Sequence, residues 1–120
     1  MSKSFVDTNV IVYANDRSDP VKQERAIQLV SDLIANGTGV TSTQVLMEYA
    51  AVASTKLGQS RDAITRQLRS LERLEVVLVT GALVRSGLEN AELYQVSYWD
   101  GVILAAAQSA HCAGLLSEDF

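Results

Sequence analysis

Short apolar segments alternate with longer amphipathic segments along the whole chain, and this alternation is what most constrains the fold. Strands are expected where a brief run rich in Val, Leu or Phe is bounded by turn or capping residues. Four runs meet this description: residues 4–7, 39–41, 75–79 and 115–116. Strands that alternate with helices predict a parallel sheet covered on both faces. We therefore expect an α/β fold, a three-layer sandwich with a mainly parallel central sheet.

Capping residues predict where the intervening helices begin and end. Asp19 and Pro20 match the cap and first position of a helix that Asn36-Gly37 would end. Ser42 or Thr43 can cap the next helix, and Thr80 can cap a later one. The expected helical ranges are 8–14, 20–36, 43–56, 61–73, 81–93 and 97–110.

The length and composition indicate a single domain over residues 1–120. Apolar residues make up 48% of the 120 residues, which is enough for a core. No apolar run approaches the ~20 residues that span a bilayer, and the first residues do not resemble a signal peptide. The single cysteine, Cys112, excludes an internal disulfide. We expect a soluble, cytoplasmic protein without a membrane segment.

The net charge of −4, from 14 acidic and ten basic residues, at first disfavours a nucleic-acid binder. The objection weakens if several acids surround bound cations, because the cations reverse the local field. The basic residues are also clustered between residues 56 and 73. Arg66, Arg69 and Arg73 are candidate RNA contacts, although they could equally form a solvated helix face or a dimer contact.

Four acidic residues interrupt or border the apolar pattern: Asp7, Glu48, Asp100 and Asp119. Asp7 and Asp119 follow the first and last predicted strands, and ligands of parallel sheets bind beyond the carboxyl ends of strands. Glu48 and Asp100 share helical faces with apolar residues, where an ionised carboxylate is costly unless a cation or donors compensate it. If these carboxylates converge, their oxygen donors favour Mg²⁺ or Mn²⁺.

Each acid taken alone also has a structural interpretation. Asp7 could be a helix cap, and Glu48 could reach solvent from the edge of its apolar stripe. Ser97 and Asp100 match the S-x-x-D form of a capping box. Asp119 lies near a terminus, where charges are usually solvated. The metal hypothesis therefore depends on the four residues occurring together.

Four segments of this chain, taken together, resemble the PIN-domain family and most closely its VapC-type toxin ribonucleases. The most specific features are Asp7-Thr8-Asn9 after the first strand and Tyr98-Trp99-Asp100 at the start of the last helix. The resembling segments are residues 5–14, 41–49, 97–107 and 115–120. The resemblance covers essentially the whole chain.

The resemblance implies a site, a cofactor and partners. The metal, Mg²⁺ or Mn²⁺, would be held by Asp7, Asp100 and Asp119. Glu48 would complete the acidic pocket, and Asn9 and Ser117 match supporting positions. The family also implies a homodimer and a cognate antitoxin protein that occludes the pocket. Because family members usually continue past the S-x-D segment, we expect the sheet to lack their last C-terminal edge strand.

The resulting hypothesis is a metal-dependent endoribonuclease that hydrolyses RNA phosphodiester bonds as the toxin of a toxin–antitoxin pair. Glu48 could alternatively be the general base that takes the proton of the attacking water. A receiver domain would need a lysine late in the chain, and none follows Lys56. A haloacid-dehalogenase-type phosphatase would need a second acid where Asn9 stands. The alternative that stays open is a catalytically silent PIN-fold domain that binds RNA or acts as a scaffold.

Overall fold

Four parallel strands form the centre of the computed structural model, which describes residues 2–117. The strands are β1 (Ser4–Val6), β2 (Gly39–Ser42), β3 (Glu75–Val77) and β4 (Gly114–Leu116). Their order across the sheet is β3-β2-β1-β4, so β1 pairs with both β2 and β4. All four predicted strands are present and all are parallel, which confirms the predicted α/β class.

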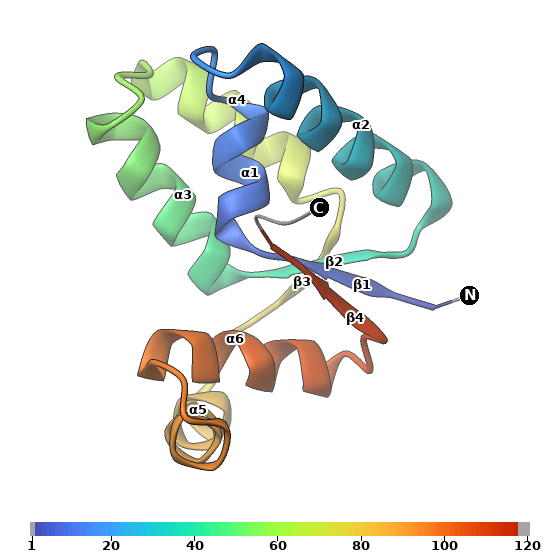
Figure 1. Cartoon of the computed structure of the whole chain (residues 1–120), viewed down its shortest axis with the longest axis vertical. Helices are drawn as coiled ribbons and strands as arrows, with labels where there is room; N and C mark the ends of the chain where they lie inside the picture. Colours follow the sequence, from blue (N-terminus) through green and yellow to red (C-terminus); the bar gives the residue numbers. More distant parts are fainter. Residues whose placement is uncertain (1, 118–120) are drawn as a thin grey trace.

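Six helices within the described residues cover the two faces of the sheet. They are α1 (Thr8–Ala14), α2 (Pro20–Asn36), α3 (Thr43–Thr55), α4 (Arg61–Leu71), α5 (Gly81–Tyr94) and α6 (Tyr98–Ser109). Helices α1 to α4 lie on one side of the sheet, and α5 and α6 lie on the other (Figure 1). This arrangement is the predicted three-layer sandwich. None of the described helices is both long and apolar enough to cross a membrane.

The helices begin at the side chains that the sequence predicts as caps. The carboxylate of Asp19 accepts a hydrogen bond from the Lys22 amide at 3.2 Å. Helix α2 ends at Gly37, whose φ of 69° is the left-handed conformation that glycine adopts without strain. Ser42, rather than Thr43, caps α3 by accepting from the Val45 amide at 3.3 Å. The ends of these helices are therefore set by local sequence signals.

Two predicted elements extend two residues beyond their observed ends, and local or tertiary hydrogen bonds explain both. Strand β3 ends at Val77 and not at Val79, because the Val79 amide donates to the Thr43 hydroxyl at 3.1 Å instead of to a neighbouring strand. Helix α4 ends at Leu71 and not at Arg73. The Leu74 amide then donates to the Leu71 carbonyl at 3.0 Å, so the chain turns directly toward β3.

The main core lies between the sheet and the layer formed by α1 to α4. Its largest fully buried side chains include Phe5, Ile11, Tyr49 and Leu71. The Tyr49 hydroxyl donates to Oε1 of Gln59 at 2.6 Å, which satisfies the phenol in its buried position. These contacts hold α1 and α3 against the strands that precede them.

Helix α5 packs very closely on α6 at two glycines, Gly87 and Gly101. A Cβ atom added at Gly101 would collide with the backbone carbonyl of Gly87, so the two helices can approach this closely only because both residues are glycine. The Asn90 side chain donates to the Gly101 carbonyl at 3.1 Å in the same interface. Two apolar residues of α5, Val84 and Leu88, are 44% and 66% exposed.

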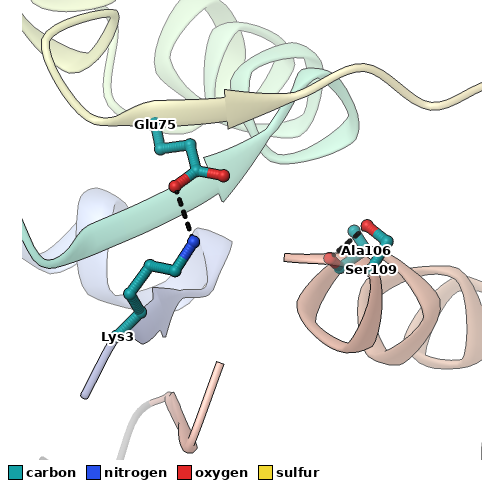
Figure 2. Close-up of polar contacts among 4 residues, drawn as sticks. All are labelled: Lys3, Glu75, Ala106 and Ser109. Carbon is teal, nitrogen blue, oxygen red and sulfur yellow. Dashed lines mark hydrogen bonds and ion pairs between the residues drawn. The ribbon is translucent and has the colours of Figure 1, made fainter. Parts of the chain in front are cut away.

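The amino-terminal edge of the sheet carries an ion pair far from the predicted acidic site. Lys3 Nζ lies 3.0 Å from Glu75 Oε1, which links the segment before β1 to the start of β3 across β2 (Figure 2). The same view shows the end of α6, where the Ser109 hydroxyl donates to the Ala106 carbonyl at 2.8 Å. The Ala106 carbonyl also accepts from the Ala110 amide at 3.2 Å, so it has two donors at the end of the helix.

Candidate functional site

Asp7 lies where β1 ends and α1 begins. Its Oδ1 accepts a hydrogen bond from the Thr8 amide at 2.6 Å, so the carboxylate caps α1. The Asp7 amide donates to the Leu116 carbonyl at 2.9 Å, which ties this junction to the carboxyl end of β4. One oxygen of Asp7 is therefore a helix cap, as the structural interpretation predicts. The capping hydrogen bond holds the carboxylate at the edge of the sheet where ligands of such folds bind.

Glu48 is half-buried near the middle of α3 and is held by two neighbours. The Thr8 hydroxyl donates to its Oε1 at 2.6 Å, and Nε2 of Gln44 approaches its Oε2 at 3.3 Å. Donors to both oxygens fix the orientation of the carboxylate and offset its partial burial. The structural alternative was a glutamate solvated at the edge of its helix face, whereas Glu48 is half-buried and hydrogen-bonded at both oxygens.

Asp100 is in the first turn of α6 and is exposed. Its amide donates to the Ser97 hydroxyl at 3.1 Å, which is the cap that the S-x-x-D pattern predicts. The expectation that Asp100 shares an inward face with apolar residues is wrong in part. The following residues of α6, from Gly101 to Ile103, are buried, whereas the aspartate itself stands at the rim.

These three carboxylates line one hollow of about 390 Å³, although their residues come from three distant segments of the chain. The hollow is lined by Asp7, Thr8, Asn9, Glu48, Ala51, Val52, Asp100 and Ile103. It lies where β1 leads into α1, beside the first turns of α6 (Figure 1). The exposed Asn9, a predicted supporting residue, is on its wall.

The other predicted site residues lie elsewhere or outside the described part. Ser117 directly follows β4, and the pairing of Val6 with Leu116 places it next to Asp7 along the sheet edge, but it does not line the hollow. Asp119 lies outside the described residues, so its place in the site stays a prediction. The predicted RNA contacts also lie away from the hollow; they are Arg66, Arg69 and Arg73, all exposed on or just after α4.

The donor chemistry of the hollow suits a hard divalent cation. Within residues 2–117, no three His, Cys, Asp or Glu side chains are close enough to form a ready-made metal cluster. Mg²⁺, however, retains several waters and is usually bound by one or two carboxylates together with substrate phosphates. An open hollow lined by three carboxylates meets that requirement. Cys112, which lies beyond the far end of α6, is a poor alternative ligand because burial raises the pKa of its thiol.

Sequence reasoning missed the two residues that orient Glu48. Thr8 belongs to the Asp-Thr-Asn motif, but nothing local indicates that its hydroxyl contacts a residue 40 positions away. Gln44 precedes Glu48 by one helical turn and is only 5% exposed. A buried amide at that spacing on an otherwise apolar face was the signal that could have identified it.

Comparisons with known proteins support the fold. The model of the PIN domain family matches residues 4–120. A toxin-antitoxin complex from Klebsiella pneumoniae superposes with a TM-score of 0.72 at 18% identity, covering 95% of this chain and 85% of that one. VapC20 of Mycobacterium tuberculosis, described as a Sarcin-Ricin loop cleaving toxin, has a TM-score of 0.67 at 18% identity, with 96% and 88% covered.

A third solved structure is VapBC2 from Rickettsia felis bound to a DNA fragment from its promoter. It has a TM-score of 0.66 at 22% identity, covering 94% of this chain and 86% of that one. At these identities the structural likeness establishes the fold alone. No curated protein matches the chain.

Proposed function

The chain belongs to the PIN domain family, and on this premise we propose that it is a metal-dependent endoribonuclease, the toxin of a toxin–antitoxin pair. The observation that carries the proposal is the meeting of Asp7, Glu48 and Asp100 around one hollow. These carboxylates come from three distant segments and lie at the edge of a parallel sheet where ligands bind. Such a group of carboxylates is typical of a site for cations and phosphates. The toxin-antitoxin complexes among the similar structures support an antitoxin as the partner.

In this proposal Asp7 and Asp100, with Asp119 as a predicted third ligand, hold Mg²⁺ or Mn²⁺. The bound ion supplies Lewis-acid chemistry and lowers the pKa of water. Glu48, fixed by Thr8 and Gln44, accepts a proton from the attacking water. The water oxygen bonds to phosphorus, the bond from phosphorus to the 3′ oxygen breaks, and the leaving 3′ oxygen takes up a proton from solvent water. Asn9 and Ser117 contribute neutral polar groups beside the substrate.

The remaining parts of the proposal concern recognition. Arg66, Arg69 and Arg73 would steer RNA by long-range attraction, since they are exposed but do not line the hollow. A homodimer and a cytoplasmic location stay predictions from the sequence. The principal rival, a catalytically silent RNA-binding or scaffolding domain, keeps the same fold and differs only in turnover.

The test is cleavage of RNA by the purified protein with Mn²⁺, Mg²⁺ or EDTA. We expect cleavage with either ion and none in EDTA. Asp7→Asn and Asp100→Asn should each abolish cleavage without changing the circular dichroism spectrum, because each removes a charge with little change in shape. Asp62→Asn is the control matched in charge and shape. Asp62 is exposed in the first turn of α4, away from the hollow, so this variant should cleave RNA normally.

Retained cleavage in both variants of the hollow would refute the site. RNA binding by the parent protein without cleavage under any metal condition would favour the silent domain instead. Loss of cleavage in Asp62→Asn as well would mean that overall charge, and not the hollow, controls the activity.

A further inference from the structure

A second hollow, of about 320 Å³, adjoins the carboxylate hollow. It is lined by Gln44, Met47, Glu48, Ala51 and Trp99. Glu48 and Ala51 line both hollows, so the two lie side by side. A chain molecule with a phosphate among the carboxylates can therefore place its neighbouring group in the second hollow.

The second hollow has large apolar side chains exposed to solvent. Trp99 is 63% exposed and Met47 is 64% exposed. Tryptophan at a surface usually marks a binding position, because its ring loses much apolar area to a partner at little conformational cost. The pair therefore forms an uncovered apolar wall directly beside the charged site.

Trp99 is held in place although its ring is exposed. Its backbone carbonyl accepts a hydrogen bond from Nε2 of Gln44 at 3.1 Å. Its ring meets the Tyr98 ring edge-on, with centroids 5.3 Å apart and planes at 67°. The wall is consequently organised before any ligand binds, which lowers the entropy lost on binding.

Gln44 connects this wall to the carboxylate hollow. The same Nε2 that holds Trp99 also approaches Glu48 at 3.3 Å, so both acceptors face the amide nitrogen. The buried Oε1 of Gln44 is left with no hydrogen-bond partner among the described residues. A buried carbonyl without a partner costs stability, and such groups in native proteins commonly belong to functional sites.

We propose that the second hollow binds one unpaired RNA base, stacked on Trp99, next to the phosphate held at the carboxylate hollow. The proposal rests on the proposed ribonuclease function and adds the recognition of a single-stranded nucleotide to it. Bases splayed out of a strand stack on aromatic side chains, and every base offers a flat face for such contact. Among the described residues that line this hollow, Glu48 alone carries a charge, so the subsite should tolerate different bases and require that the base be unpaired.

The alternative occupant is an apolar protein surface, from an antitoxin or a second copy of the chain. The adjacency of the two hollows favours the nucleotide, since a base and its phosphate belong to one molecule and need neighbouring sites. A protein partner would not require this adjacency. The experiment below separates the two.

Trp99 is the only tryptophan in the chain, so its fluorescence reports the second hollow alone. The probes are short single-stranded RNA oligomers, the same sequences annealed into duplexes, and abasic ribose-phosphate oligomers of equal length. Titrations use Asp7→Asn with Mg²⁺, so that bound RNA is not cleaved. We expect single-stranded RNA to quench the fluorescence, and duplex or abasic oligomers to leave it unchanged at equal concentration.

Kinetic comparison supplies the second measurement. Trp99→Ala should raise the KM for single-stranded RNA about tenfold with little change in kcat, which is the size of one lost base–aromatic stack. Trp99→Phe should restore most of the affinity. Tyr94→Ala, which removes an aromatic ring that is 51% exposed on α5, is the control and should match the parent.

An unchanged KM in Trp99→Ala, or quenching by abasic oligomers equal to that by RNA, would overturn the proposal while leaving the ribonuclease function standing. A change of native mass in Trp99→Ala with unaltered RNA kinetics would also overturn it, and would assign the wall to a protein interface. A parent protein that neither binds nor cleaves any RNA would overturn the ribonuclease function and this proposal together.

Discussion

Individual hydrogen bonds determine the orientation of Glu48, the candidate general base. Glu48 stands on a helix face that also carries buried Val45 and half-buried Val52, and the Thr8 hydroxyl holds its carboxylate at the hollow. The Thr8 hydroxyl reaches it because α1 starts immediately after β1. The function of Glu48 should therefore depend on a residue that has no titratable group of its own.

Thr8→Val should reduce the rate of RNA cleavage about tenfold with a small change in KM, because the carboxylate loses a fixed donor. The free energy of unfolding should fall by about 1 kcal/mol, the usual net value of one hydrogen bond. Thr8→Ser keeps the hydroxyl and should retain most of the rate. Steady-state kinetics and urea denaturation measure both quantities. Equal rates for the Val and Ser variants would show that this bond does not orient Glu48.

Tyr49 provides a residue-scale prediction about pH. Burial raises the pKa of its phenol above the usual value of about 10. The contribution of the Tyr49 phenol to the free energy of unfolding is thus fully present below about pH 10, and it is lost as the pH rises through the raised pKa. Tyr49→Phe should lose about 1–3 kcal/mol near neutral pH, since Gln59 loses its donor. The variant's stability should then fall less steeply above about pH 10 than the parent's.

Urea denaturation of parent and variant at neutral and alkaline pH tests this expectation. Tyr94→Phe is the control, because Tyr94 is exposed and should not alter either curve. Parallel losses of stability in Tyr49→Phe and the parent above pH 10 would assign the alkaline transition to other groups.

At the scale of elements, the site depends on how closely α5 and α6 pack. Helix α6 supplies Asp100 and Trp99, and α5 supports it from the side away from the sheet (Figure 1). The contact is made by backbone atoms at Gly87 and Gly101, which cannot yield as a flexible side chain can. The position of the first turn of α6 should therefore be sensitive to a single methyl group.

Gly101→Ala should destabilise the protein by about 1–3 kcal/mol, the usual cost of overpacking, because its Cβ meets the carbonyl of Gly87. Cleavage should fall as well, since Asp100 is the adjacent residue. Gly81→Ala is the control, because the nearest atom to an added Cβ there is the end of the Arg85 side chain at 3.8 Å. Thermal unfolding distinguishes the two. Equal melting temperatures for both variants would contradict the close packing of these helices.

At the scale of the whole molecule, the carboxylates link folding to metal binding. A ligand that binds only the folded state stabilises it by about 2.7 kcal/mol at a hundredfold excess over Kd. Mn²⁺ should thus raise the melting temperature of the parent, and the increase should be smaller in Asp7→Asn. In EDTA the variant should match or exceed the parent, because Asn caps a helix as well as Asp does and carries no charge beside the other acids.

Melting curves in EDTA and in Mn²⁺ check this prediction, with Asp62→Asn as the variant that should keep the full response. A variant Asp7→Asn that is less stable in EDTA and keeps the full response to Mn²⁺ would mean that Asp7 is a cap only. The carboxylates would then not form a metal site around this residue.

The sequence by itself determined the order of the elements, most helix starts and the acidic residues worth examining. These are local properties, since a cap such as Asp19 or Ser97 acts within one turn and a strand such as β1 is recognised from its own apolar residues. The family resemblance added the grouping of Asp7, Glu48 and Asp100, whose residues no local rule connects. For Asp119 that grouping stays a prediction.

Only the tertiary structure decided which residues surround those acids. The bond from Thr8 to Glu48 joins residues 40 positions apart, and the second hollow depends on α3 meeting the first turn of α6. The tertiary structure also left Val84 and Leu88 of α5 exposed, whereas Gly87 of the same helix is buried against Val102 of α6. Periodicity predicts that a helix has an apolar face. The segment that packs against this face is determined by contacts between distant parts of the chain, about which the local pattern holds no information.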